Sequence, residues 1–123
     1  MQDQSKVVVN LATGHEDAER VTVAFLVANA ALEKGRPVAM FATKEAVRLG
    51  VPGYADAIEA AGSPPLARLF GQFAELGGEL LLCPICFNAR RLDESAIVPG
   101  ARLGGATPLW DWVGEGASTV FSY

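Results

Sequence analysis

The feature that most constrains the fold of this 123-residue chain is an alternation between short, continuously apolar runs and segments with helical signals. Three runs, KVVVNLAT (6–13), RPVAMFAT (36–43) and ELLLC (79–83), are rich in aliphatic residues. Such runs are typical of strands that are buried on both faces, as in a parallel sheet. With STVFSY (118–123) as a last strand, the order is β-α-β-α-α-β-α-α-β, which predicts parallel strands joined by right-handed crossovers.

The segments between the strands carry start and stop signals for helices. The longest, 17–34, begins with acidic residues and is followed by Gly35, which favours a helix that ends there. In 63–78, Ser63 is a candidate N-cap, prolines follow it, and apolar residues recur at helical spacing. Shorter helices are expected at three further places: after Thr43, within 84–91 and within 108–113. Asp93 is a candidate cap for one more helix start.

Composition and charge exclude several classes of protein. Half of the residues are hydrophobic, which is enough for a core, and the length suits a single domain over 1–123. The formal net charge is −4 and no Lys/Arg cluster has the density of a nucleic-acid surface, so no nucleic-acid partner is expected. No apolar stretch is long enough to span a bilayer, and the polar start MQDQS does not resemble a signal peptide, so we expect a cytoplasmic protein without membrane contact.

The expected helix at 17–34 is apolar around more of its circumference than one packed face requires. Residues at helical spacing form the stripe that a sheet would cover: Val21, Ala24, Phe25, Ala28 and Leu32. Further apolar residues lie partly outside that stripe: Val23, Val27, Ala30 and Ala31. A second apolar side indicates contact with another subunit. The alternative is that small residues such as alanine tolerate partial exposure.

Two tryptophans lie close together near the end of the chain. Trp110 and Trp112 are two residues apart on a short expected helix, so their side chains point to different sides. We expect one of them in the core and the other as an interface anchor. Ordinary packing of both side chains is the alternative.

The only two cysteines stand together in the sequence CPIC, directly after the third apolar run. Proline disfavours helical geometry in the residue before it and suits the first helical position, so Cys83 is the expected N-cap of a helix that begins at Pro84. The free N–H groups of the first turn and the helix dipole favour a thiolate at Cys83. Arg90 and Arg91 add positive charge nearby. Cys83, Cys86 and Arg90 are therefore the candidate catalytic residues.

Three other interpretations of the cysteine pair stay open. Both residues could be buried and structural, because free cysteine is among the most buried residue types. They could bind zinc, but four ligands are normally needed and the chain adds only His15 and carboxylates, so no metal site is assigned. The spacing also fits a thioredoxin-like redox couple, although the pair follows the third strand instead of lying early in the chain.

The loop ATGHED (12–17) follows the first strand at the same edge of the predicted sheet. Thr13, Gly14 and His15 are candidate ligand-binding residues, because an anion can bind at the N-terminus of the helix that follows. The loop lacks the G-x-G-x-x-G and Walker patterns, so a dinucleotide or nucleoside triphosphate is not expected, and no cofactor is assigned. The alternative for His15 is an exposed or capping side chain without a chemical role.

Four stretches carry a family resemblance: KVVVNLATG with the acidic residues after it, ALEKGRPVAMFATKEAV, GGELLLCPICFNARR and GATPLWDWVGEGASTVFSY. The chain resembles the DsrE/DsrF-like family, which includes sulfur-relay and YchN-like proteins. Together with the strand pattern, the resemblance implies a three-layer α/β/α domain with a mainly parallel five-stranded sheet, in a homo-oligomer that is a trimer or a hexamer. It places Cys83 where sulfur-relay members carry a persulfide, and Cys86 where YchN-like members have an extra cysteine. The family's Arg-Gly after the cysteine is replaced here by Arg90 and Arg91.

The expected function is thiol-based sulfur handling, as a persulfide carrier or a sulfurtransferase-like protein. In this hypothesis Cys83 accepts sulfane sulfur, Cys86 resolves the persulfide and Arg90 stabilises the anion. The expected partners, besides further copies of the chain, are sulfur donor and acceptor proteins. One alternative is an oligomeric module that binds a small ligand or a metal with the cysteines as ligands. Another is a structural or docking subunit whose thiols are inert.

Overall fold

The computed structural model describes residues 4–123, and its centre is a five-stranded sheet in which neighbouring strands are parallel. The strand order across the sheet is β4-β3-β2-β1-β5. The strands are β1 (Lys6–Leu11), β2 (Val38–Ala42), β3 (Glu79–Leu82), β4 (Ala101–Leu103) and β5 (Ser118–Ser122). The parallel five-stranded sheet expected above is thus confirmed.

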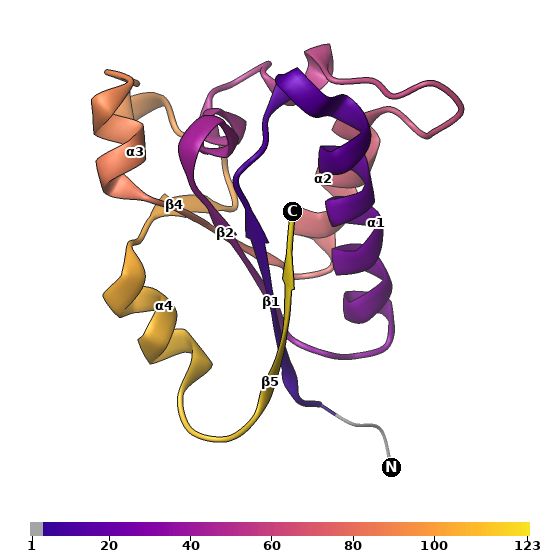
Figure 1. Cartoon of the computed structure of the whole chain (residues 1–123), viewed down its shortest axis with the longest axis vertical. Coiled ribbons are helices and arrows are strands. Elements are labelled where there is room, and N and C mark those ends of the chain that lie inside the picture. The colour runs from indigo at the N-terminus through magenta and orange to yellow at the C-terminus, as the bar shows by residue number, and fades with distance from the viewer. Residues whose placement is uncertain (1–3) are drawn as a thin grey trace.

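Helices lie on both sides of the sheet and give a three-layer α/β/α fold. The α-helices are α1 (Ala18–Glu33), α2 (Leu66–Glu75), α3 (Pro84–Ala89) and α4 (Ala106–Val113). Figure 1 shows α1 and α2 together on one side of the sheet and α4 on the other. Short 3-10 helices occupy four connections: η1 (His15–Asp17), η2 (Lys44–Gly50), η3 (Ala55–Ala57) and η4 (Glu94–Ala96). In the described part of the chain, no helix combines the length and the apolar character needed to cross a membrane.

The continuous apolar runs form strands that are buried on both faces, as their sequence predicts. On the side of α1 and α2, Val7, Val9 and Leu11 of β1 belong to the main apolar cluster. Phe25 of α1 packs there edge-to-face against Phe73 of α2, with 5.5 Å between the ring centroids. The opposite face of the sheet is also covered at three positions: Val8, Ala39 and Leu81.

Helix α1 begins and packs as the sequence predicts. Asp17 is its N-cap, and the Asp17 carboxylate accepts a hydrogen bond from the N–H of Arg20 at 3.1 Å. Most of the predicted stripe is fully buried: Val21, Ala24, Phe25 and Ala28. On the rest of the helix, Val23 and Leu26 are 39% and 42% exposed, so a second apolar side faces solvent in the single chain. The subunit contact expected from this side stays a prediction.

The structure differs from two local expectations and confirms a third. The short strand β4 had no counterpart among the predicted segments, because three residues with Arg102 in the middle carry no strand pattern. Ser63 does not cap α2, which begins only after Pro65, where the backbone is still extended at φ −56° and ψ 140°. Adjacent prolines hold the chain in this extended form, so the helix starts later than the first of them. The helix expected after Thr43 is the 3-10 helix η2.

Neither tryptophan lies in the core, so the expectation of a core tryptophan was wrong. Trp110 is 72% exposed. Trp112 is partly buried, and the Lys6 ammonium lies 5.2 Å from the centroid of its ring. Helix α4 therefore covers its side of the sheet less closely than α1 and α2 cover theirs.

Candidate functional site

The candidate site lies at the edge of the sheet where the parallel strands end. The N–H of Cys83, just after β3, donates to the carbonyl of Ala42 at 2.9 Å. The N–H of Thr43, just after β2, donates to the carbonyl of Leu11 at 2.9 Å. Sheet pairing thus continues one residue past the strands and sets Ala12, Thr43 and Cys83 side by side. Open parallel sheets bind their ligands outside this edge.

Cys83 is the N-cap of α3, and Pro84 occupies the first turn, as the sequence predicts. The backbone of Cys83 has φ −60° and ψ 118°, and its carbonyl accepts the hydrogen bond from Phe87 at 2.9 Å. Among the described residues, no N–H of the first turn is hydrogen-bonded to the Cys83 side chain. The sulfur is thus placed beside the helix N-terminus without being held by a capping bond.

Cys86 lies one turn further along the same short helix. Both cysteines are free thiols, and both are partly buried against the edge of the apolar cluster. Between them in sequence, Ile85 is 80% exposed, so the outer surface of this turn is open to solvent. The pair is therefore accessible from outside while its inner side rests on the core.

Arg90 is held by a carboxylate that the sequence analysis did not single out. Its Nε donates to Oε1 of Glu45 at 2.8 Å, and its Nη1 donates to the carbonyl oxygen of Cys86 at 3.2 Å. Arg48 donates from Nε to the other carboxylate oxygen of Glu45 at 2.7 Å. These hydrogen bonds, first that of Arg90 and then that of Arg48, lower the pKa of Glu45 below its ordinary value. The Glu45 carboxylate therefore ties η2 to the end of the cysteine helix.

The loop after β1 packs against Tyr54 and against Cβ and the backbone of Glu45. A Cβ on Gly14 would lie 2.4 Å from Oη of Tyr54 and 3.1 Å from Cβ of Glu45, so only glycine fits here without a shift. The N–H of His15 donates to Oη of Tyr54 at 2.8 Å, and Nδ1 of His15 lies 3.0 Å from the same oxygen. Burial raises the pKa of Tyr54 above its ordinary value. Glu45 and Tyr54 thus connect the loop to the cysteine segment.

The candidate anion-binding residues have fewer free donors than the sequence suggested. Thr13 is buried. The N–H of Gly14 donates to Oε1 of Glu16 at 2.8 Å, and that of His15 donates to Tyr54. Two of the loop's N–H groups are therefore used within the protein and do not point to a free anion site.

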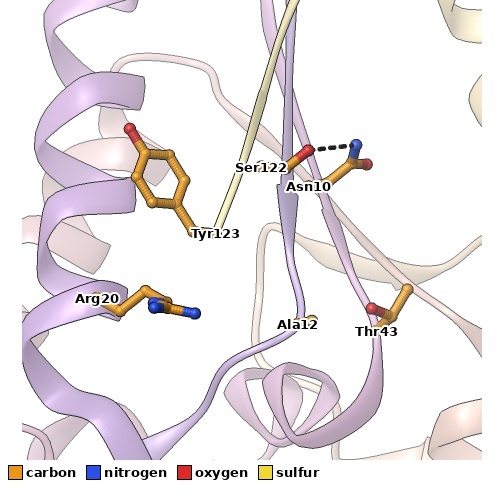
Figure 2. Close-up of a pocket in the computed structure, with 6 residues that line it drawn as sticks. All are labelled: Asn10, Ala12, Arg20, Thr43, Ser122 and Tyr123. Carbon is orange, nitrogen blue, oxygen red and sulfur yellow. Dashed lines mark hydrogen bonds between the residues drawn. The ribbon is translucent and has the colours of Figure 1, made fainter.

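A pocket at the same edge was not predicted from the sequence. It has a volume of about 440 Å³ and six lining residues, which we call the edge pocket: Asn10, Ala12, Arg20, Thr43, Ser122 and Tyr123. Figure 2 shows them around the ends of β1, β2 and β5, with Arg20 reaching in from α1. The side-chain amide of Asn10 donates to Oγ of Ser122 at 3.3 Å. The signal available in sequence was polar residues inside apolar strands, Asn10 in KVVVNL and Ser122 in STVFS.

The described residues do not supply the set of ligands that the alternative of a metal site requires. Across residues 4–123, the structure contains no group of three or more His, Cys, Asp or Glu side chains that could hold a metal ion. Cys83 and Cys86 supply two thiolate ligands, and a structural zinc site needs four. A metal bound by both cysteines therefore needs ligands that this part of the chain does not bring to them.

Comparison with known proteins assigns the chain to a family. The model of the DsrE/DsrF-like family matches residues 5–121. The chain belongs to this family. The YchN protein from E. coli has a similar structure, with a TM-score of 0.78, 16% identity, and coverage of 97% of this chain and 99% of that one. A protein of unknown function, MTH1491 from Methanobacterium thermoautotrophicum, has a TM-score of 0.66, 12% identity, and coverage of 94% of this chain and 97% of that one.

These likenesses confirm the α/β fold of a DsrE/DsrF-like protein. At sequence identities of 16% and 12%, these likenesses show the fold but not the chemistry. No curated protein sequence matches the chain. The residues at the edge of the sheet therefore carry the information on function.

Proposed function

We propose that this DsrE/DsrF-like protein handles sulfane sulfur through Cys83 and Cys86. The observation that carries the proposal is the position of Cys83. It is an accessible thiol at the carboxyl end of a parallel strand and the N-cap of the following helix, with a second thiol one turn away. The thiolate is the attacking form of cysteine, and its reactivity depends on how accessible it is. Membership of a family that includes sulfur-relay proteins supports the same chemistry.

The proposed chemistry has two steps that balance without a cofactor. The Cys83 thiolate attacks the outer sulfur of a donor persulfide, the donor thiolate leaves, and Cys83 carries a persulfide. An acceptor thiolate can then remove that outer sulfur and regenerate Cys83. Alternatively, the Cys86 thiolate attacks the inner sulfur, a Cys83–Cys86 disulfide forms, and sulfide leaves. In that branch the sulfane sulfur is reduced, and a thiol reductant must restore the two cysteines.

Arg90 acts in this proposal through the helix that carries the thiols. Its guanidinium bridges the Glu45 carboxylate and the Cys86 carbonyl, so it fixes the second half of α3 relative to η2. Its guanidinium is paired with the Glu45 carboxylate, which it shares with Arg48. We therefore assign it the positioning of the cysteine helix and a secondary part in stabilising the anion.

The test is the intact mass of the protein after incubation with inorganic polysulfide. The wild-type chain should gain whole sulfur atoms, Cys83→Ser should gain none, and Cys86→Ser should gain sulfur and retain it longer, because the resolving thiol is missing. The two variants are matched, since each removes one of the two thiols. Equal loss of loading in both variants, or no gain by the reduced wild-type protein, would contradict the proposal.

A further inference from the structure

The edge pocket lies at the point where the chain switches from adding strands on one side of β1 to adding a strand on the other side. From β1 the chain passes through α1 to β2, β3 and β4 on one side of β1, whereas β5 lies on the other side of β1 and follows α4. Figure 1 shows α1 and α4 on opposite faces of the sheet. Such a switch point, outside the carboxyl ends of the strands, is where open parallel sheets bind ligands. The pocket's volume of about 440 Å³ is in the usual range for small molecules.

The lining of the edge pocket favours a carboxylate. Arg20 is the one lining residue with a charged side chain. Further polar side chains come from four lining residues: Asn10, Thr43, Ser122 and Tyr123. Nε of Arg20 faces Oδ2 of Asp17 at a long 3.6 Å. Within residues 4–123, the two terminal nitrogens of the Arg20 guanidinium make no hydrogen bond to another residue. A guanidinium with two free parallel donors matches the two oxygens of a carboxylate.

The edge pocket and Cys83 are neighbours along one edge. Leu11, Ala42 and Leu82 are in register across three strands, so the residues that follow them, Ala12, Thr43 and Cys83, stand in a row. Two strand spacings separate the ends of this row, which is about 10 Å. Thr43 lines the pocket and is the middle member of the row. A ligand held in the edge pocket beside Ala12 therefore needs to extend by about this length along the edge to reach the thiol.

We propose that the edge pocket binds the carboxylate of a low-molecular-weight persulfide, which delivers its outer sulfur to Cys83. This inference rests on the proposed function and adds the class of donor. An extended molecule of three residues spans about 10 Å, which matches the distance along the row. Arg20 is then a binding residue that orients the donor, and Thr43 lies along the path to Cys83.

The transfer step is an exchange between two thiols. The Cys83 thiolate attacks the outer sulfur of R–S–S⁻, the bond between the two donor sulfurs breaks, and R–S⁻ leaves with the electron pair. The products are the Cys83 persulfide and the donor thiolate, so no oxidant or reductant is consumed. The carboxylate of R takes no part in the bond changes, and its contribution is to bring the donor to the pocket.

The first experiment compares two sulfur donors on three proteins at about 0.15 M salt, where long-range charge effects are largely screened. Glutathione persulfide carries carboxylates, whereas inorganic polysulfide has none. For Arg20→Gln, the glutathione persulfide concentration that gives half-maximal loading of Cys83 should rise about tenfold, because a charge-assisted contact of about 1.5 kcal/mol is lost. Polysulfide loading should change by less than about twofold. Arg68→Gln, an exposed arginine on α2, is the matched control and should leave both donors unchanged.

The second experiment measures binding without transfer. S-methylglutathione cannot donate sulfane sulfur. Calorimetry should show that it binds to Cys83→Ser, that adding Arg20→Gln weakens this binding about tenfold, and that adding Arg20→Lys weakens it less.

In the first experiment, if Arg20→Gln reduced loading equally with both donors, or changed it with neither, the inference would be overturned while sulfur handling stayed intact. If polysulfide and glutathione persulfide both fail to load the wild-type protein, the proposed function fails. In that case, S-methylglutathione binding that depends on Arg20 would still establish the edge pocket as a binding site. If S-methylglutathione did not bind either, the binding site would be refuted as well.

Discussion

At the scale of single residues, Glu45 is the side chain on which most of the candidate site depends. Its two carboxylate oxygens accept from Arg90 at 2.8 Å and from Arg48 at 2.7 Å, and its backbone touches the position of Gly14. It therefore joins three segments that follow three different strands. Partly exposed ion pairs of this kind contribute about 0.2–1 kcal/mol each, so the pair of contacts is a modest but real part of the stability of this edge.

The variant Glu45→Gln should lose about 1 kcal/mol of unfolding free energy at pH 7. The loss should depend on pH, because the two arginines lower the pKa of Glu45 below its ordinary 4.5. A carboxyl group with a lowered folded pKa contributes stability above its unfolded pKa and loses it as the pH falls through the folded pKa. The difference in unfolding free energy between wild type and variant should therefore be constant above pH 4.5 and should shrink toward zero below it. Urea unfolding across this range measures it.

Glu59→Gln is the matched control for that experiment. Glu59 is exposed, and Glu59→Gln removes the same charge from the chain as Glu45→Gln does. The unfolding free energy of this control should therefore stay close to that of the wild type at every pH. A gap for Glu45→Gln that persists unchanged well below pH 4 would show that the loss comes from packing and not from the ion pairs.

At the scale of elements, the loop after β1 and the segment after β2 fit together because one position lacks a side chain. Gly14→Ala would place its Cβ 2.4 Å from Oη of Tyr54 and 3.1 Å from the backbone oxygen of Glu45. Overpacking of this kind costs about 1–3 kcal/mol. We expect Gly14→Ala to lower the unfolding free energy by that amount, and Tyr54→Phe in the same chain to recover part of it, because the clashing hydroxyl is removed. Denaturant unfolding of the single and double variants gives both values.

The control for this prediction has the opposite expected sign. Gly71 lies inside α2, and a Cβ there would have no neighbour within 4 Å. Gly71→Ala should therefore raise the unfolding free energy by about 0.5–1 kcal/mol, the usual gain from alanine in a helix interior. If Gly14→Ala stabilised the protein as Gly71→Ala does, the close fit between the two segments would not exist.

The elements also show what the sequence can and cannot predict. Continuous apolar runs predicted β1, β2 and β3, and the proline after Cys83 predicted the N-cap of α3, since both signals are local. Strand β4 was missed because its three residues form a strand only by pairing with β3. The contacts of Glu45 with Arg90 and of His15 with Tyr54 join residues 45 and 39 positions apart, and no local pattern encodes them. The edge pocket likewise exists only because β1, β2 and β5 end together.

At the scale of the whole molecule, apolar residues remain exposed on α4 and on both faces of the edge strand β5. Trp110 is 72% exposed, Val120 is 57% exposed and Phe121 is 39% exposed. Trp110 and Val120 line one shallow groove together. Strand β5 pairs only with β1, so in the described part of the chain its outer edge is open. Open apolar edge strands tend to pair with another chain unless something covers them.

We therefore predict that the protein is a homo-oligomer whose contacts include β5 and α4. Light scattering coupled to gel filtration should give a mass of several chains for the wild type, consistent with the trimer or hexamer expected from the family resemblance. Val120→Lys should shift the protein to the monomer without changing its circular dichroism, because a buried unpaired charge at the centre of this surface is costly. Val23→Lys, on the exposed side of α1, tests whether that side takes part as well. A wild-type monomer at micromolar concentration would contradict the prediction, and dissociation by Val23→Lys alone would move the interface to α1.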